Sequence, residues 1–246
     1  MNNKPQISFI IPARNEENFI GNCLDSIQRQ ELSDSFEVIV VNNNSTDKTV
    51  LIARTKKARI EYENKPGLSN VRAKGVESAN GQIIIFIDAD TVLPPQWAKI
   101  ATGWLKKSEN IVAISCGFKF YDGKFYEKIA CTLFQSINPL CSFLLGFFGK
   151  PQVLYGQSFA VRKSSLIKAG GINMDFPFYA EDIAMAERLR KVGKIKYLNS
   201  IKVSTSARRY RKLGIVKTLY YYLIPTLLLL IGRYDSAKKF ASNKKV

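Results

Sequence analysis

The chain has 246 residues, of which 46% are hydrophobic, enough for one α/β domain with a large core, and this composition excludes a disordered protein. Its formal net charge is +17 and it contains no histidine. The lack of histidine excludes imidazole metal sites, Ser-His triads and histidine general bases, so acid-base chemistry must fall to Asp, Glu, Lys, Tyr or Cys.

In the first half of the chain, apolar runs typical of strands alternate with helical patterns. The first strand is predicted at Ile7–Ile11, ended by Pro12, and a helix with one apolar stripe follows at Glu17–Gln30. The next predicted elements are strands at Phe36–Val41, Ala58–Tyr62 and Gln82–Ile87, separated by helices that end at Arg54 and Ala79. This alternation predicts βαβ units, and therefore an α/β fold with a mostly parallel sheet flanked by helices.

Polar clusters follow three of these strands, at residues 14–16, 42–44 and 88–90. In open sheets of this kind, ligands bind beyond the carboxyl ends of the strands, so the three clusters should meet at one edge. We expect Asp88 and Asp90, on an extended strand tip, to point the same way and to share one hard divalent cation, which commonly carries a phosphate. Taken alone, an Asp pair at a strand end is more often a turn or a helix cap.

Several segments resemble, in order, motifs of the family 2 glycosyltransferases, which are inverting sugar transferases with the GT-A fold. The resemblance covers roughly residues 6 to 205. Ser8–Glu16 resembles the first strand and nucleotide-contacting loop, and Val40–Asp47 is similar to the Val-Val-Asp-Asp-Gly-Ser-Thr-Asp stretch. Gly67–Gly75 resembles the Gly-x-x-x-Ala-Arg-Asn-x-Gly stretch, and Asp88-Ala89-Asp90 matches the metal and diphosphate motif.

The resemblance implies a nucleotide-diphosphate sugar as donor and Mg²⁺ or Mn²⁺ as cofactor, held by Asp88 and Asp90. Asn42 stands where the family usually has the acid that holds the base, and its side-chain carbonyl can still accept from a uracil N–H. The choice of base therefore stays open. The implied donor-binding residues are Pro12, Arg14, Asn15, Glu16, Asn42, Asn43, Arg72, Asp88, Ala89 and Asp90.

Two acids, Glu181 and Asp182, open a helix predicted to run through Val192. In the family the second acid of this pair is usually the catalytic base. An acceptor hydroxyl is a poor nucleophile until a carboxylate takes its proton, so Asp182 is the expected base and Glu181 the next candidate. Without the other motifs, acids in a first helical turn would be read as favouring the helix dipole.

A basic stretch, Ser204–Arg211, follows a predicted strand. Some family members use a late Gln-x-x-Arg-Trp motif near the leaving diphosphate, and this chain lacks that form. Arg208 or Arg209 can serve instead, and the alternative is a role at a membrane surface. The expected division is a catalytic domain over residues 1–207 and a basic, apolar, membrane-associating tail over residues 208–246.

Two apolar segments are candidates for contact with a bilayer. Ile129–Gly149 is uncharged for 21 residues, but if it crossed the membrane it would separate Asp88 and Asp90 from Asp182. It is therefore predicted to be a helix pair facing lipid or acceptor, with a plain core helix as the alternative. Leu219–Ile231 is too short to span the bilayer comfortably. The stretch from Arg208 onward contains ten Lys or Arg and one acid, so the segment is predicted to be an interfacial anchor on an anionic membrane.

The sequence therefore predicts a metal-dependent inverting glycosyltransferase that acts on a carbohydrate or lipid-linked acceptor in cell-envelope glycolipid or polysaccharide synthesis. The residues before the first strand lack the apolar core of a signal peptide, and the cysteines, without CxxC spacing, are expected to be reduced, buried thiols. Both observations favour a cytoplasmic protein at the inner face of the membrane. One alternative, a sugar nucleotidyltransferase, should have a Gly-rich, Lys-bearing loop after the first strand. The other alternative is a non-catalytic protein that binds nucleic acid or membrane. The sequence contains no nucleic-acid-binding motif, and we expect no nucleic acid as a partner.

Overall fold

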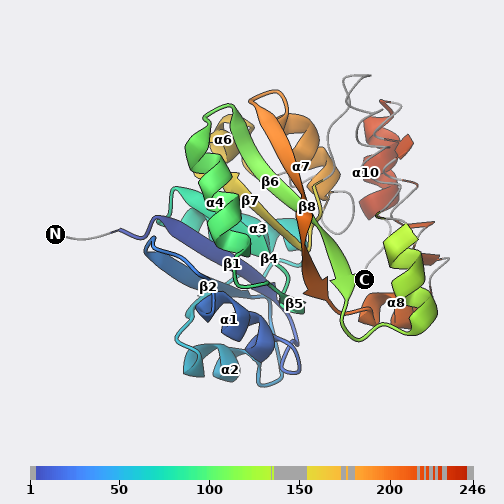
Figure 1. Ribbon diagram of the computed structural model, residues 1–246. Helices are drawn as coiled ribbons and strands as arrows, with labels where there is room; N and C mark the ends of the chain where they lie inside the picture. The colour runs from blue at the N-terminus through green and yellow to red at the C-terminus, as the bar shows by residue number, and fades with distance from the viewer. Residues whose placement is uncertain are drawn as a thin grey trace.

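The computed structural model describes residues 4–133, 135, 154–172, 176, 181–214, 217, 218, 220, 221, 224, 227, 228 and 232–242. Within this part of the chain, the strands form one eight-stranded sheet in the order β3-β2-β1-β4-β7-β6-β8-β5 (Figure 1). The strands are β1 (Ile7–Ala13), β2 (Phe36–Asn42), β3 (Arg59–Tyr62), β4 (Ile83–Ile87), β5 (Thr91–Val92), β6 (Ile111–Phe120), β7 (Ser158–Arg162) and β8 (Lys194–Thr205). The helices with assigned bounds are α1 (Ile20–Gln28), α2 (Thr49–Thr55), α3 (Leu68–Ser78), α4 (Trp97–Lys107), α6 (Lys163–Lys168), α7 (Glu181–Leu189), α8 (Arg208–Leu213) and α10 (Tyr234–Ser242).

The sheet is mostly parallel, which confirms the predicted fold class. Strands β3, β2, β1 and β4 are parallel neighbours, as the βαβ pattern predicted. The second half of the chain adds a different pattern, because β7 runs antiparallel between β4 and β6, while β6 and β8 are parallel and β5 is antiparallel to β8. The parallel half therefore carries the three predicted polar clusters at one edge.

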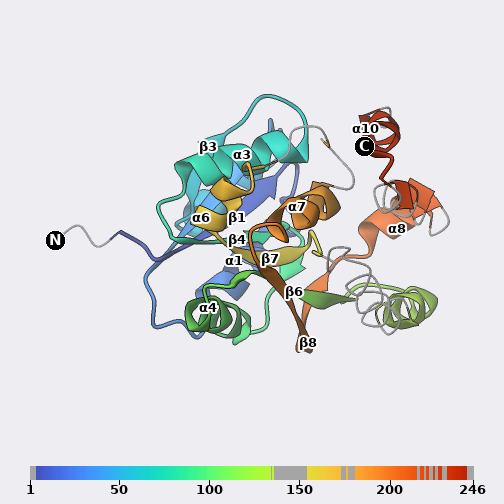
Figure 2. The same cartoon turned by 90° about the horizontal axis from the view of Figure 1, so that it is seen from above.

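Alternate residues of the central strands pack into two separate hydrophobic cores. On β1, Phe9 and Ile11 face one core, and Ile10 faces the other. Strand β4 shows the same alternation, and all five of its residues are buried. Helices α1, α2 and α4 cover the first face, whereas α3, α6 and α7 cover the second, giving three layers (Figure 2). A strand buried on both faces explains the unbroken apolar run before Asp88.

Several element boundaries differ from the sequence prediction by one to three residues; helix α7, for example, ends at Leu189 rather than Val192. Two of the differences have a clear local cause. Strand β1 continues through Pro12 to Ala13, although the proline was expected to end it. The pairing of β1 with β4 stops at Ile10, so Pro12 lies where the strand has a neighbour on one side only, a position that tolerates proline. Helix α1 begins at Ile20 rather than Glu17, because the backbone N–H of Glu17 donates to Asp47 and holds this stretch as a loop.

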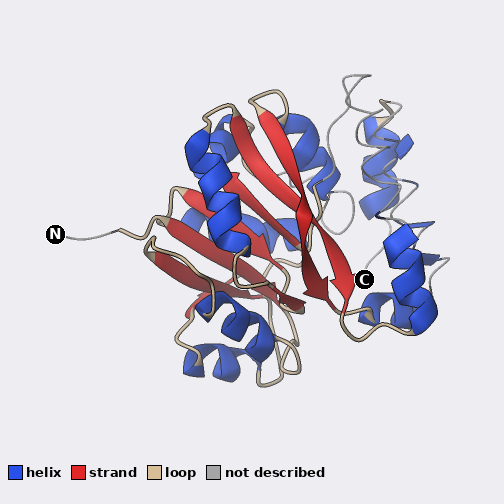
Figure 3. Cartoon of the chain, in the orientation of Figure 1, coloured by secondary structure: helices blue, strands red, loops and turns tan. Residues whose placement is uncertain are grey.

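Additional helices gather beside the β8 end of the sheet (Figure 3). They comprise residues 125–133, α8 and α10, and described residues between 217 and 228 are also helical. Tyr221 and Ala237 pack with Phe176 and with Ala184 of α7, so the tail contacts the main domain. Among the residues that the structure describes, no helix is long and apolar enough to cross a membrane.

Parts of two predicted segments lie outside the described residues. These are most of Ile129–Gly149 and most of Leu219–Ile231. The three described cysteines, Cys23, Cys116 and Cys131, are free and buried, as predicted, and Cys141 lies outside the described residues.

Candidate active site

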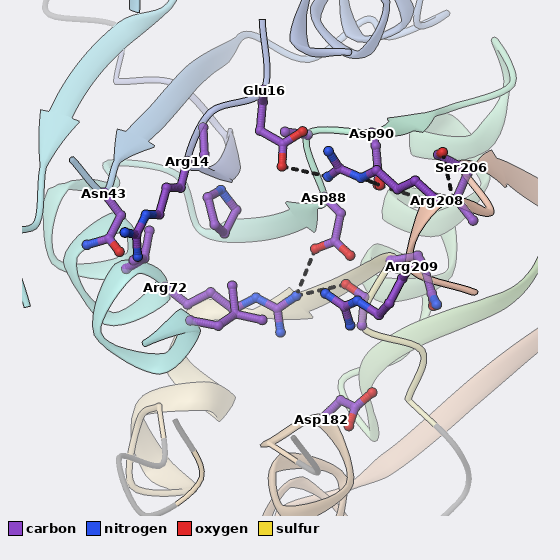
Figure 4. Close-up of a pocket in the computed structure, with 18 of the residues that line it drawn as sticks. Arg14, Glu16, Asn43, Arg72, Asp88, Asp90, Asp182, Ser206, Arg208 and Arg209 are labelled. Atoms are coloured by element: carbon purple, nitrogen blue, oxygen red, sulfur yellow. Dashed lines mark hydrogen bonds and ion pairs between the residues drawn. The ribbon is translucent and has the colours of Figure 1, made fainter. Parts of the chain in front are cut away.

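A cavity of about 350 Å³ lies at the carboxyl ends of β1, β2 and β4 (Figure 4). It is lined by Pro12, Ala13, Arg14, Glu16, Asn43, Gly67, Leu68, Val71, Arg72, Asp88, Ala89, Asp90, Phe120, Gly156, Gln157, Glu181, Asp182, Thr205, Ser206, Arg208, Arg209 and Tyr210. Most of the residues singled out in the sequence therefore line one cavity, including Arg208 and Arg209 from the segment assigned to the tail.

Two of the expected donor-binding residues do not line this cavity. Asn42 is 5% exposed, and its side-chain carbonyl accepts from the backbone N–H of Ser45 at 3.2 Å. Asn15 accepts from the backbone N–H of Thr46 at 2.9 Å and has a positive φ of 55°. Both side chains hold the loops that follow β1 and β2, and Asn43 is the asparagine that faces the cavity.

The Asp88–Asp90 segment is a turn rather than the expected extended tip. The backbone N–H of Thr91 donates to the carbonyl oxygen of Asp88 at 2.9 Å, which closes the turn. The expectation of an extended tip was wrong because this four-residue turn leads directly into the short strand β5. Both carboxylates nevertheless line the cavity, as the motif required.

The guanidinium of Arg72 joins three segments at the floor of the cavity. Its side chain, on α3, is 1% exposed and forms an ion pair with Glu181 at the start of α7. Its Nη2 lies 3.3 Å from Asp88 Oδ1 and donates to the Gly156 carbonyl at 2.8 Å. The aromatic rings of Phe86 and Phe159 lie 5.5 Å from the guanidinium carbon, so cation–π contacts add to the ion pairs of this side chain.

Glu181 and Asp182 are adjacent in sequence but have different partners. One Glu181 oxygen pairs with Arg72, and the other accepts from the Ser69 hydroxyl at 3.1 Å. Both oxygens of this buried acid are therefore engaged, which fits a residue that positions Arg72. Burial and the neighbouring Glu181 charge raise the pKa of Asp182 to about 6, against the opposing charge of Arg72. A carboxylate poised near neutral pH suits a general base.

Arg208 lies between two acids of the opposite wall (Figure 4). Its Nη2 donates to Glu16 at 2.6 Å, and its Nε donates to Asp90 Oδ2 at 2.8 Å. The other Asp90 oxygen accepts from the Thr205 hydroxyl at 3.3 Å. Burial raises the pKa of Glu16, and hydrogen bonding from Arg208 opposes that shift. Arg208 was predicted near the diphosphate, and in the structure it contacts Asp90, one of the two carboxylates expected to hold the metal.

The donor set of the cavity fits a hard divalent cation. Asp88 and Asp90 supply carboxylate oxygens, which Mg²⁺ and Mn²⁺ prefer. Burial raises the pKa of Asp88 to about 6, with Arg72 opposing and Asp90 adding to the shift. Within the described part of the chain, no three His, Cys, Asp or Glu side chains form a ready-made metal cluster. Magnesium sites that use one or two carboxylates usually complete their shell with substrate phosphates and water.

Several lining residues were missed in the sequence. Phe120 and Tyr210 form a ring pair with centroids 5.0 Å apart, and neither has a motif that would have indicated it. Thr205 and Ser206 lie in the basic stretch whose arginines drew the prediction. Gln157 was not missed, because Gly156–Arg162 resembles the family's stretch that lines the donor sugar. Its side-chain oxygen lines the cavity, is buried and, among the described residues, has no hydrogen-bond partner.

Fold and site together define a GT-A type sugar transferase. The sequence profile of glycosyl transferase family 2 matches residues 8–169, and the chain belongs to this family. Family membership favours the transferase over the nucleotidyltransferase and the nucleic-acid-binding protein.

Curated relatives match over part of their length. The glycosyltransferase EpsJ of Bacillus subtilis is 34% identical over 119 residues, covering 46% of this chain and 34% of EpsJ. Poly(ribitol-phosphate) beta-glucosyltransferase of Bacillus spizizenii is 28% identical over 235 residues, covering 89% of this chain and 32% of that protein. The chain therefore spans about a third of the length of these two relatives.

Solved structures share the fold over nearly the whole chain. Glucosyl-3-phosphoglycerate synthase from Mycobacterium tuberculosis, in complex with Mn²⁺, UDP and glucosyl-3-phosphoglycerate, superposes with a TM-score of 0.66 at 24% identity. That match covers 93% of this chain and 80% of the synthase. TarS of S. aureus gives a TM-score of 0.62 at 17% identity, covering 94% of this chain and 43% of TarS. At these identities the likeness shows the fold.

Proposed function

We propose that the chain is a metal-dependent inverting glycosyltransferase that moves a sugar from a nucleoside-diphosphate donor to an acceptor hydroxyl, in cell-envelope glycolipid or polysaccharide synthesis. One observation carries the proposal: Asp88, Asp90 and Asp182 face the same cavity, although they come from opposite halves of the chain. A transferase of this type needs acids for the donor's metal and a separate base for the acceptor. The poly(ribitol-phosphate) beta-glucosyltransferase among the relatives supports a polymer as the acceptor.

The mechanism is a single displacement at the anomeric carbon. Asp182 takes the proton of the acceptor hydroxyl as its oxygen forms the new bond to that carbon, and the bond to the diphosphate oxygen breaks with its electron pair. Attack from the face opposite the leaving group inverts the anomeric configuration. Arg72 holds Asp88 and the Gly156 carbonyl in place during this step. A divalent cation on Asp88 and Asp90, when bound, would neutralise the charge that develops on the leaving diphosphate.

Asn43 supports a uridine donor. Its side-chain N–H groups donate to the backbone carbonyls of Glu63 and of Lys65, which fixes the direction of the amide. The carbonyl oxygen of the Asn43 side chain is then the atom available to a ligand, and it can accept from the N–H of uracil. The synthase from Mycobacterium tuberculosis was solved with UDP and with UDP-glucose, which agrees with this choice of base.

The surface beside the site supports a peripheral membrane location at the inner face, with a lipid-linked acceptor. On the helix of residues 125–133, Phe125, Ile129 and Leu133 recur every fourth residue and are 80%, 43% and 59% exposed. The opposite face of the helix buries Glu127 and Cys131. An apolar stripe on a protein of charge +17 suits an anionic leaflet.

The test is a binding and transfer assay with a panel of nucleoside diphosphates and nucleotide sugars in Mn²⁺. We expect UDP and one UDP-sugar to raise the melting temperature by mass action, and excess chelator to abolish the shift. Asp90→Ala should remove both this shift and sugar transfer, while the melting temperature without ligand stays near that of the wild type, because the turn residue adds little to the core. Wild-type transfer at full rate in excess chelator would contradict the metal-dependent mechanism.

A further inference from the structure

Arg208 contacts Asp90, one of the two carboxylates that would hold the metal. Its guanidinium bridges Asp90 and Glu16, whose side chains are each 13% exposed, and Arg208 itself is 36% exposed. The ring of Phe19 lies 4.5 Å from the guanidinium carbon. A charged hydrogen-bond donor therefore already neutralises one of the two expected metal ligands.

The backbone around Arg208 is anchored, so the bridge is not a chance contact of a long surface side chain. The carboxylate of Asp122 accepts from the Ala207 backbone N–H at 2.7 Å and from the Ser206 hydroxyl at 2.7 Å. Arg211, one turn further along α8, also donates to Asp122, at 2.7 Å. Asp122 thus fixes the start of α8 from both sides and holds Arg208 at the mouth of the cavity.

Glu16, which forms an acid pair with Asp90 around Arg208, has one carboxylate oxygen left for a second cation. One of its carboxylate oxygens accepts from Arg208. The other, Oε2, is buried and, within the described part of the chain, has no hydrogen-bond partner. Leaving a buried carboxylate oxygen without a partner is unfavourable, and a cation next to Asp90 would supply one. Guanidinium and metal then compete for overlapping ligands, since Asp90 would have to serve both.

We propose that Arg208 is an internal cation that occupies the Asp90–Glu16 pair in the nucleotide-free protein and is displaced from Asp90 when a divalent metal binds with the nucleotide. The inference rests on the proposed function for the metal and the donor. The displaced guanidinium, still tethered by Asp122, becomes a ligand for the diphosphate. Metal and nucleotide must then bind together: the metal alone has to displace Arg208, whereas the diphosphate offers Arg208 a new anionic partner.

The test measures Mn²⁺ binding to the nucleotide-free protein by electron paramagnetic resonance, without any turnover. We expect Arg208→Ala to tighten the Mn²⁺ dissociation constant by about tenfold or more, because the competing cation is gone. Arg208→Gln, which keeps a hydrogen-bonding side chain without the charge, should give a similar shift. The matched control is Arg59→Ala, which removes an arginine of β3 that pairs with Glu37 on β2 and with Glu61, and it should change the constant less than twofold.

A second measurement adds UDP. In the wild type, UDP should tighten Mn²⁺ binding strongly, and in both Arg208 variants this gain should shrink because there is little competition left to relieve. Unchanged or weaker Mn²⁺ binding in folded Arg208 variants would overturn the proposal. UDP binding that is equally tight in chelator, and lost in Arg208→Ala, would also overturn it, since Arg208 would then replace the metal. Neither result depends on transfer, so failure of the proposed function would be seen separately in the transfer assay.

Discussion

The two acids at the start of α7 show how the partners of a side chain decide its chemistry. Glu181 has a partner on each oxygen, the guanidinium of Arg72 and the hydroxyl of Ser69. Asp182 lies against Gly156, where an added Cβ would come within 3.3 Å of its Oδ2. It keeps a raised pKa of about 6, so it can accept a proton at neutral pH. We therefore assign the base to Asp182 and the positioning of Arg72 to Glu181.

Asp182→Asn tests the base. The change keeps the volume but removes the proton acceptor, so transfer should fall by roughly 100-fold or more while donor affinity stays near that of the wild type. With a pKa of about 6, wild-type kcat should rise with pH, reach half of its maximum near pH 6 and level off at higher pH, and the variant should lack this rise. Saturating donor and metal keep Asp88 charged during the measurement. A full rate in Asp182→Asn would move the role to another residue.

Arg72→Ala tests the buried ion pair at the cavity floor. Removing one partner of such a pair leaves Glu181 buried and uncompensated, so the free energy of unfolding should fall by about 3–5 kcal/mol. Arg59→Ala, which breaks ion pairs of a side chain that is 41% exposed, should cost less than about 1 kcal/mol. Urea unfolding followed by circular dichroism measures both. Equal losses in the two variants would mean that Arg72 contributes no more than a surface charge.

The sequence could predict part of the site because motifs record which residues face a ligand. Asp88, Asp90 and Arg72 were placed from short local patterns, and all three line the cavity. The partners of Arg208 could not be predicted, since it meets Glu16 across 192 positions of the chain. The same limit applies to Asn42, whose residue type suited a base contact but whose carbonyl caps a turn with Ser45.

At the scale of elements, the close packing of α3 on the sheet depends on a glycine. A Cβ at Gly75 would overlap Ile10 Cγ2 and lie 3.3 Å from Val41 Cγ2, both in the core. Glycine costs helix stability elsewhere but lets α3 approach β1 and β2 here. The approach in turn brings Arg72, on the preceding turn of α3, to the floor of the cavity.

Gly75→Ala and Gly103→Ala form a matched pair. Both positions are helical, but a Cβ at Gly103 on α4 meets nothing within 4 Å. Gly75→Ala should therefore lower the free energy of unfolding by about 1–3 kcal/mol through overpacking. Gly103→Ala should raise it by about 0.5–1 kcal/mol through helix propensity. Denaturant midpoints measure both, and a stabilised Gly75→Ala would show that Ile10 can move aside freely.

The order of elements was predictable for the parallel half, where periodicity and the βαβ rule agree. The antiparallel insertion of β7 between β4 and β6 was not, because pairing direction depends on contacts between segments more than 70 residues apart, such as Ile84 with Val161. Boundaries also shifted where a side chain from elsewhere competes for the backbone, as Asp47 does at Glu17.

At the scale of the whole molecule, the charge of +17 and the exposed stripe of helix 125–133 predict binding to anionic vesicles. The double change of Phe125→Asp and Leu133→Asp should strongly reduce co-sedimentation, because it adds charge where lipid contact is expected. Leu51→Asp, at a position 61% exposed on α2, should not. Raising salt to 1 M, where the Debye length is about 3 Å, should loosen binding by the wild type.

If the double variant of Phe125 and Leu133 bound vesicles as well as the wild type, the basic tail would be the membrane contact instead of the stripe. If the wild type fails to bind anionic vesicles at low salt, the peripheral location is wrong. Donor hydrolysis measured in the same samples would show whether the variants keep an intact cavity, since the stripe residues do not line it.

The network around Arg72 also has a consequence for how such a chain can evolve. Its hydrogen-bond partners lie in the turn after β4, in the turn before β7 and on α7, so only the last residues before β7 contribute to it from the segment between β6 and β7. The register of β6 with β7 fixes both ends of that segment. Loops on a rigid scaffold tolerate insertion and exchange. A lineage could therefore exchange the residues between Asp122 and Leu154 while keeping the contacts that hold Arg72 and Arg208.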